Sequence, residues 1–287
     1  MNRLPAWLNQ DIPNEETLRL TAMLQESGVH TVCREAHCPN ITECFSKGQL
    51  AFMILGDTCT RSCAFCAVKN NSQQGVAIDP QLPKRIAALV EKLDLKYVVI
   101  TSVTRDDLPD AGASFFAETV QAVRLQNESV RIEALIPDFQ AKDGALQAMI
   151  TARPDVIAHN LETVKRLYPE VRPKADYDLS LQVLGRIKII NPSIITKSSL
   201  MLGMGETEEE VYQAMKDLRR YGCNCLTLGQ YLAPSKDHYP VKEFVAPAQF
   251  EAYRLQGLEL GFRNVFAGPK VRSSYMAEEL VRETIRA

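Results

Sequence analysis

Six of the eight cysteines in the chain fall into two closely spaced triplets. The downstream triplet has the pattern C-x3-C-x2-C and the upstream one C-x4-C-x5-C; their members are Cys59, Cys63 and Cys66, and Cys33, Cys38 and Cys44. Thiolates at such short spacings favour zinc or iron–sulfur clusters. A structural zinc site closes with four protein ligands, so each triplet is one ligand short. A [4Fe–4S] cluster held by three thiolates instead leaves one iron open to a small molecule. The downstream triplet therefore predicts an iron–sulfur cluster, with zinc as the alternative.

The bulk composition is that of a globular protein with no general affinity for polyanions. The chain has 287 residues, 46% of them hydrophobic, and a formal net charge of −2. This length allows one or two domains with a sizeable core, and the charge gives no sign of binding to nucleic acid or anionic membranes. The first 16 residues, MNRLPAWLNQDIPNEE, lack the apolar segment of a secretory signal. We expect a cytoplasmic protein, in which cysteines indicate metal binding or catalysis rather than disulfides.

Strand-like and helix-like segments alternate from about residue 50 onward. The apolar runs that suit buried strands cover residues 50–55, 96–103, 130–137, 154–161, 194–202, 223–232 and, more briefly, 262–268. The segments typical of helices cover residues 83–94, 113–126, 141–152, 176–190, 207–221 and 247–259. This order predicts a parallel sheet with right-handed crossovers. About six such units are fewer than the eight of a closed barrel. We therefore predict an α/β fold, an open partial (β/α)6 barrel; a flat, doubly wound sheet fits the same pattern.

One predicted helix has a clear start and end. Thr207 and Glu210 fit the S/T-x-x-E capping box, and Gly222 stands where the helix would stop. The downstream cysteine triplet follows the first predicted strand, so it should lie at the carboxyl end of the barrel, where the active sites of such folds gather.

The C-x3-C-x2-C pattern, with Phe65 before its last cysteine, resembles the signature of the radical S-adenosylmethionine (SAM) superfamily. The upstream C-x4-C-x5-C resembles the auxiliary-cluster motif of one of its families, the lipoyl synthases. Further stretches of the chain are similar to that family, and they are GDTCTRSCAFCAV (56–68), TSVTRDDLPDAGA (101–113), IEALIPDF (132–139), HNLETVKRLYPEVRP (159–173), TKSSLMLGMGET (196–207), LTLGQYLAPS (226–235) and VRSSYMAEE (271–279).

The resemblance implies two [4Fe–4S] clusters, with SAM as co-substrate. The downstream triplet would bind the cluster that cleaves SAM to a 5′-deoxyadenosyl radical. The upstream triplet would bind an auxiliary cluster, with its fourth ligand from the Arg-Ser-Ser-Tyr motif at residues 272–275. We assign this ligand to Ser274, with Ser273 as the fallback. An alkoxide is a harder ligand than a thiolate and suits iron–sulfur bonding less well. One corner of the auxiliary cluster would thus open easily, as a sulfur donor requires.

Candidate SAM contacts follow from the ends of the predicted strands. The resemblance points to Ser102, Arg105 and Asp106 after the second strand, and to Asn160 after the fourth. Asp106 also suits a turn or helix cap, and Asn160 also suits an ordinary polar loop. His159 is a weaker candidate for the same site.

Four further residues are interpreted one by one. Arg172 suits either a carboxylate partner or a solvated surface charge. We expect Lys197 to face the barrel lumen, where it would need a partner. Cys223 and Cys225 alternate on a predicted strand, so we expect both on one face, as core residues.

The implied reaction is insertion of two sulfur atoms, at C6 and C8 of an octanoyl chain that is amide-linked to a lysine of a lipoyl carrier protein. These carbons carry no acidic proton, so acid–base catalysis cannot activate them. The implied partners are that carrier, a flavodoxin- or ferredoxin-like electron donor and a cluster-repair protein. Alternative interpretations of the protein are a methylthiotransferase, a biotin synthase, a zinc-binding module and an iron–sulfur electron carrier.

The expected domain organisation has three parts. An N-terminal extension over residues 1–48 carries the upstream triplet. The partial barrel spans residues 49–260, and a C-terminal extension over residues 261–287 carries the Arg-Ser-Ser-Tyr motif.

Overall fold

The computed structural model describes residues 4–9 and 12–286, so the outermost parts of the two predicted extensions, residues 1–3 and 287, lie outside it. An eight-stranded sheet forms the centre of the described chain, in the order β1-β2-β5-β6-β7-β8-β9-β10. Its strands are β1 (His30–Thr31), β2 (Ala51–Ile54), β5 (Tyr97–Ser102), β6 (Arg131–Leu135), β7 (Val156–Ala158), β8 (Ile195–Leu202), β9 (Cys225–Gln230) and β10 (Asn264–Gly268). A separate two-stranded sheet joins β3 (Thr58–Cys59) to β4 (Lys69–Asn70).

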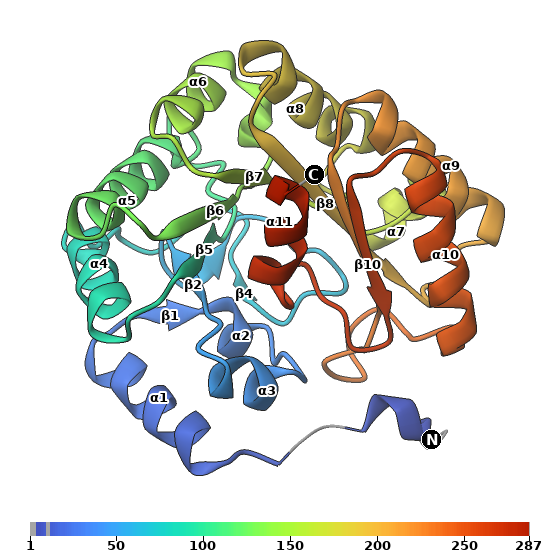
Figure 1. Cartoon of the computed structure of the whole chain (residues 1–287), viewed down its shortest axis with the longest axis horizontal. Helices are drawn as coiled ribbons and strands as arrows, with labels where there is room; N and C mark the ends of the chain where they lie inside the picture. Colours follow the sequence, from blue (N-terminus) through green and yellow to red (C-terminus); the bar gives the residue numbers. More distant parts are fainter. Residues whose placement is uncertain (1–3, 10–11, 287) are drawn as a thin grey trace.

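Helices follow the strands and cover their outer face. Those of the repeating units are α4 (Leu82–Lys92), α5 (Ala113–Gln126), α6 (Asp143–Thr151), α8 (Tyr177–Ile190), α9 (Glu208–Arg220) and α10 (Pro247–Glu259). The remaining ones are α1 (Glu15–Glu26), α2 (Val32–Glu35), α3 (Ile41–Ser46), α7 (Tyr168–Val171) and α11 (Ala277–Arg286), with 3-10 turns at Ala6–Leu8, Phe139–Ala141 and Lys165–Leu167. Figure 1 shows helices α4, α5, α6, α8, α9 and α10 in an arc outside the strands, with α11 inside that arc.

The sheet is parallel from β2 to β10, and β1 pairs antiparallel with β2 at its edge. β1 and β10 are its two ends, and they do not pair with each other in the described chain. The sheet is therefore curved and open, and the predicted partial barrel is confirmed. All six predicted strand–helix units are present. The strand expected at 262–268 is β10, a seventh parallel strand, so the sheet extends past the predicted barrel boundaries at both ends.

The local signals in the sequence explain where α9 begins. The Thr207 side chain accepts from the backbone N–H of Glu210, and the Glu210 side chain accepts from the backbone N–H of Thr207, which forms the predicted capping box. After the helix, Gly222 has φ +80°, a conformation that favours glycine.

The core lies on both faces of the sheet. On the outer face, the strands pack against the arc of helices. On the inner face, α11 lies in the lumen that the curved sheet encloses, and its apolar side chains contact inward-facing strand residues such as Tyr97 and Val99. These side chains are Ala277, Leu280 and Val281.

Lys197 also faces the lumen, as predicted. It is fully buried, and its Nζ lies 2.6 and 2.8 Å from the two carboxylate oxygens of Glu133. Tyr97 donates a further hydrogen bond to Glu133, at 2.7 Å. The carboxylate thus has the partners that burial requires.

The two remaining cysteines are core residues, as predicted, but they do not share a face. Cys223 packs among the residues between sheet and helices, whereas Cys225 faces the lumen. The reason is that β9 begins at Cys225, so Cys223 belongs to the turn after α9 and the strand alternation does not include it.

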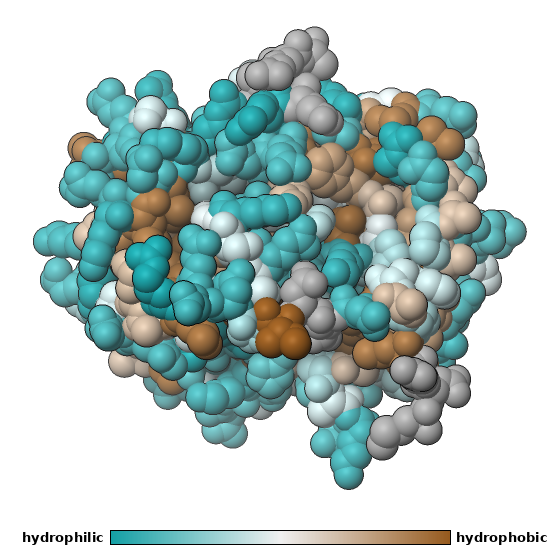
Figure 2. Space-filling view, turned by 60° about the horizontal axis from the view of Figure 1, so that its bottom comes forward, coloured by the Kyte–Doolittle hydropathy of each residue, from teal (hydrophilic) through white to brown (hydrophobic). Residues whose placement is uncertain are grey.

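The surface has no helix suited to a bilayer in the ranges that the structure describes: none combines the necessary length with the necessary apolar character. Hydrophilic residues dominate the face shown in Figure 2, and hydrophobic residues appear there in separate groups.

Candidate active site

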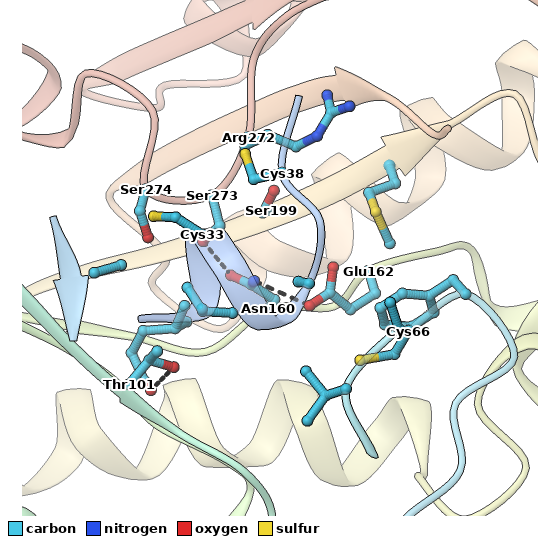
Figure 3. A pocket seen from close by; sticks show the side chains of 18 of the residues that line it. Cys33, Cys38, Cys66, Thr101, Asn160, Glu162, Ser199, Arg272, Ser273 and Ser274 are labelled. Atoms are coloured by element: carbon cyan, nitrogen blue, oxygen red, sulfur yellow. Dashed lines mark hydrogen bonds between the residues drawn. The ribbon is translucent and has the colours of Figure 1, made fainter. Parts of the chain in front are cut away.

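A cavity of about 480 Å³ opens at the carboxyl ends of the parallel strands. Both cysteine triplets and both serines of the C-terminal motif line it, although they come from widely separated parts of the sequence. Figure 3 shows Cys33, Cys38, Cys66 and the two serines in this wall. The lining of the cavity thus includes Cys33, Cys38, Cys44, Cys59, Cys63, Cys66, Ser273 and Ser274. The fold therefore brings together the eight side chains that the sequence suggested as cluster ligands.

The loop after β2 carries the downstream triplet, and hydrogen bonds fix its shape. The Cys59 Sγ accepts from the backbone N–H groups of Arg61, at 3.4 Å, and Thr104, at 3.3 Å. The Arg61 side chain, which is 8% exposed, binds two carboxylates, with Nε 2.7 Å from Asp106 and Nη2 2.9 Å from Asp138. Bidentate contacts of this kind define geometry closely, so Arg61 holds the cysteine loop against the loops that follow β5 and β6.

The upstream triplet lies on the N-terminal extension. Cys33 belongs to α2 and Cys44 to α3, with Cys38 in the turn between them. The C-terminal extension packs against this unit through side-chain hydrogen bonds: Asn40 to the Lys270 carbonyl, Tyr275 to Glu43 at 3.0 Å, and Lys47 to the Met276 Sδ at 3.9 Å. Gln49, directly after the extension, donates to the same sulfur at 3.3 Å.

Gly229 on β9 permits this approach of the C-terminal segment. A Cβ atom at that position would lie 1.9 Å from the Val271 carbonyl oxygen, which is far inside contact distance. Only glycine therefore lets β9 pack against the residues that lead into the Arg-Ser-Ser-Tyr motif.

The two serines of the motif differ in their partners. Ser273 Oγ donates to Asn160 Oδ1 at 2.9 Å, and Asn160 Nδ2 donates to Glu162 at 3.0 Å (Figure 3). The Ser274 hydroxyl lines the cavity and, within the described residues, forms no side-chain hydrogen bond. Ser274 is thus the serine whose oxygen is available to a ligand in the cavity.

The predicted SAM contacts divide into two groups. Ser102 and Asn160 line the cavity, and the Ser102 hydroxyl is buried without a partner in the described chain. Arg105 and Asp106 are outside the cavity lining. Arg105, 3% exposed, binds the carbonyls of Leu55 and Val76 and the Asp107 carboxylate, and Asp106 binds Arg61. Both therefore shape the loops around the cavity through ion pairs.

The residues that directly follow β7 form more of the cavity wall than the sequence predicted. His159 is 3% exposed; its Nδ1 donates to the Ile136 carbonyl at 2.9 Å, and its Nε2 faces no partner in the described residues. Burial lowers the pKa of His159 to about 4, so the ring is neutral and Nε2 is an acceptor. The position of His159 directly after a barrel strand was the sequence signal that could have assigned it to the site.

Glu162 and Arg172 complete this wall. Burial raises the pKa of Glu162, while Arg172 opposes that shift. Arg172 binds the Tyr168 hydroxyl at 2.9 Å and the carbonyls of Asn160 and Leu161, each at 3.2 Å, and its Nε lacks a partner in the described chain. It is therefore neither in a direct carboxylate pair nor a solvated surface charge, the two roles expected for it. Glu162 carried no motif signal of its own.

The cavity is chemically suited to iron–sulfur clusters and a polar ligand. Burial raises the pKa of Cys33, Cys44 and Cys66 to about 12, so a bound cation is needed to keep them as thiolates. In the described ranges, no three His, Cys, Asp or Glu side chains stand close enough to hold one metal ion. In an iron–sulfur cluster each thiolate binds a different iron atom, so the three thiolates stand farther apart than the ligands of one metal ion. The unpartnered atoms of Ser102, His159 and Arg172 offer hydrogen bonds to a polar molecule.

Comparisons with solved structures identify the fold. The chain is similar to methylornithine synthase, with a TM-score of 0.56 at 13% identity over 96% of this chain and 89% of that one. It is also similar to Streptococcus suis SuiB bound to S-adenosylmethionine, with a TM-score of 0.58 at 10% identity over 83% of this chain and 55% of that one. At such low identity, the likeness concerns the fold alone.

Sequence comparisons identify the family. Residues 53–218 match the radical SAM superfamily. The chain is 52% identical to the lipoyl synthase of Thermus thermophilus, over 97% of this chain and 87% of that protein. It is 50% identical to the lipoyl synthase of Caldicellulosiruptor saccharolyticus, over 97% of both. Sequence identity at this level over almost the whole chain identifies the family: the chain belongs to the lipoyl synthases of the radical SAM superfamily.

Proposed function

We propose that this enzyme inserts sulfur atoms at C6 and C8 of an octanoyl chain that is amide-linked to a lysine of a lipoyl carrier protein. The observation that carries the proposal is the single cavity that both cysteine triplets and the C-terminal serines line. A radical source and a sulfur donor must both reach the same carbon atoms, and one shared cavity allows this. When bound, SAM and its cluster supply a 5′-deoxyadenosyl radical, and the auxiliary cluster supplies sulfur.

In this proposal Cys59, Cys63 and Cys66 hold the cluster that binds SAM. The N–H groups that point at the Cys59 Sγ stabilise a thiolate there, because a charged acceptor strengthens each hydrogen bond. Ser102 and Asn160 contact SAM, and the neutral His159 accepts a hydrogen bond from a donor group of the bound molecule. Arg105 and Asp106 act on the site through the loops that they hold.

Cys33, Cys38 and Cys44, with Ser274, hold the auxiliary cluster. The assignment of Ser274 rests on its free hydroxyl, because the Ser273 hydroxyl is already bound to Asn160. An alkoxide ligand matches iron–sulfur bonding less well than a thiolate does. This corner of the cluster would therefore release its iron most readily.

The two extensions act as one unit in this scheme. Residues 1–48 bring the three upstream cysteines, and residues 261–287 bring the serine, through the hydrogen bonds between the two segments. The cavity wall also has apolar residues, which include Met53, Leu135, Ile136, Met201 and Leu232. Apolar walls suit an octanoyl chain and keep water from the reacting carbons.

Three partners follow from this chemistry. The substrate chain is carried by a lipoyl carrier protein, since the fatty acyl group is bound to a lysine. A flavodoxin- or ferredoxin-like protein supplies single electrons. A cluster-repair protein restores the auxiliary cluster after its sulfur has been used. The cytoplasm is the compartment in which these proteins and reduced thiols occur together.

Anaerobic reconstitution with iron and sulfide tests the proposal. The enzyme is then incubated with SAM, a reductant and an octanoyl-lysine peptide, and the products are analysed by mass spectrometry. We expect 5′-deoxyadenosine together with a peptide that has gained two sulfur atoms. Cleavage of SAM without any gain of sulfur would contradict the assigned substrate. A colourless, zinc-loaded protein that leaves SAM intact would overturn the whole proposal.

A further inference from the structure

The C-terminal motif and the strand end beside the downstream triplet are joined by a short chain of hydrogen bonds. Ser273 donates to the Oδ1 of Asn160, which lies 113 positions earlier in the sequence, and Asn160 donates from Nδ2 to Glu162 (Figure 3). Ser273 and Asn160 come from different parts of the fold, the C-terminal extension and the loop after β7. Their contact therefore links two regions that the proposed chemistry needs at the same time.

These two hydrogen bonds define the orientation of the Asn160 amide. An asparagine side chain has an oxygen that accepts and a nitrogen that donates two hydrogens. With the oxygen toward Ser273 and one hydrogen toward Glu162, the second hydrogen on Nδ2 remains for a ligand in the cavity that Asn160 lines. A rotated amide would turn its oxygen toward the Glu162 carboxylate and lose that contact, and the Ser273 hydroxyl would then have to accept from the amide nitrogen instead of donating to the oxygen.

The two ends of this chain of hydrogen bonds are anchored differently. Glu162 belongs to the barrel: its backbone N–H donates to the Ser199 carbonyl at 2.9 Å, and its carbonyl accepts from Met201 at 2.8 Å. Ser273 sits in a segment whose side-chain contacts run to the N-terminal extension, through Tyr275 and Glu43 among others. The orientation of Asn160 therefore depends on whether the C-terminal segment is docked.

We propose that Ser273 is a positioning residue that orients Asn160 for SAM and thereby couples SAM binding to the docking of the segment that carries Ser274. This inference rests on the proposed function. Docking of the segment places Ser274 at the auxiliary site and Ser273 against Asn160 in one step. SAM is then bound most tightly when the sulfur-donating site is assembled, which limits the release of radicals when that site is incomplete.

A double-mutant cycle on the reconstituted enzyme tests this coupling. The SAM dissociation constant is measured anaerobically for the wild type, Ser273→Ala, Asn160→Ala and the double variant, with iron and sulfide content determined for each. Ser273→Thr keeps a hydroxyl and serves as the conservative variant. Ser193→Ala is the matched control, because Ser193 also donates to an asparagine, Asn191 at 2.7 Å, but is exposed and outside the cavity lining.

We expect Ser273→Ala to retain wild-type iron and sulfide and to bind SAM about three- to tenfold more weakly, the effect of one lost hydrogen bond. The double variant should bind SAM no more weakly than Asn160→Ala alone, and Ser273→Thr should restore most of the affinity. Equal SAM affinity of Ser273→Ala and wild type, or effects that multiply in the double variant, would overturn the inference. A wild-type enzyme that does not bind SAM would overturn the proposed function as well.

Discussion

The Tyr275 hydroxyl donates a hydrogen bond to Glu43 at 3.0 Å, across 232 positions of sequence, and so joins the C-terminal motif to the helix that carries Cys44. Burial opposes ionisation of Glu43, but hydrogen bonds from Lys47 and Tyr275 lower its pKa. The glutamate is therefore a charged acceptor, and its bond to Tyr275 is stronger than one between neutral groups.

Tyr275→Phe should loosen the C-terminal segment without unfolding the barrel. Loss of a hydrogen bond to a charged group costs about 1.5–3 kcal/mol, here discounted to about 1 kcal/mol because Glu43 is partly exposed. Hydrogen exchange should show faster amide exchange over residues 270–276 and unchanged exchange in the barrel strands. Tyr212→Phe, at an exposed tyrosine on α9, is the control and should leave both unchanged. Equal exchange of residues 270–276 in Tyr275→Phe and wild type would contradict the assigned role.

Substitution of a cysteine in one triplet should affect SAM cleavage differently from substitution in the other. Cys33→Ala should lose about half of the bound iron and still cleave SAM, whereas Cys63→Ala should lose a similar share of iron and all SAM cleavage. Cys223→Ala is the matched control, since Cys223 is a buried core thiol outside the cavity, and it should keep all its iron. Iron analysis and 5′-deoxyadenosine formation measure these outcomes. Loss of SAM cleavage in Cys33→Ala would show that the triplets do not have separate roles.

His159 should make the stability of the chain depend on pH. Burial lowers the pKa of His159 from 6.5 to about 4. Between these values the unfolded chain binds more protons than the folded one, so stability is complete above about pH 6.5 and falls as the pH decreases toward 4. The full effect is about 3 kcal/mol.

Urea unfolding between about pH 7 and about pH 5 tests this dependence. His159→Gln should remove most of the slope, because glutamine keeps an acceptor but does not titrate. His30→Gln, at an exposed histidine, should keep it. An unchanged slope in His159→Gln would assign the dependence to other groups.

Lys197→Met should destabilise the barrel strongly. The substitution would leave Glu133 charged and fully buried with Tyr97 as its remaining donor. Removal of one partner from a buried ion pair costs about 3–5 kcal/mol. The double variant Lys197→Met/Glu133→Gln should recover part of that loss, because no uncompensated charge remains. Denaturant unfolding gives both values, and a single variant as stable as the wild type would exclude a stabilising role for the pair.

The elements of the barrel follow from local patterns, which is why the sequence predicts them well. The expected helix at 113–126 is observed as Ala113–Gln126, and the capping box of α9 begins that helix as predicted. The short β1 was missed because two residues carry no periodic signal, and it forms only by pairing with β2. The prediction that Cys223 and Cys225 share a face was wrong because the start of β9 is decided by the preceding turn.

The site is less predictable than the fold, since its contacts join distant parts of the chain. The thiol spacing and the serine motif indicated eight side chains, and all of them line the cavity. No local pattern shows that Arg105 binds backbone carbonyls beneath the loop, or that Arg61 pairs with both Asp106 and Asp138. The bond from Ser273 to Asn160 likewise depends on how the C-terminal segment docks.

The source of the inserted sulfur is the most direct test of the account. The enzyme is reconstituted with sulfide enriched in a heavy sulfur isotope, and one turnover is followed with the octanoyl-lysine peptide. We predict that both sulfur atoms of the product are heavy, and that Cys33→Ala forms no sulfur-containing product while it still cleaves SAM. A product with sulfur of natural mass, or a labelled product from Cys33→Ala, would contradict the role assigned to the upstream triplet.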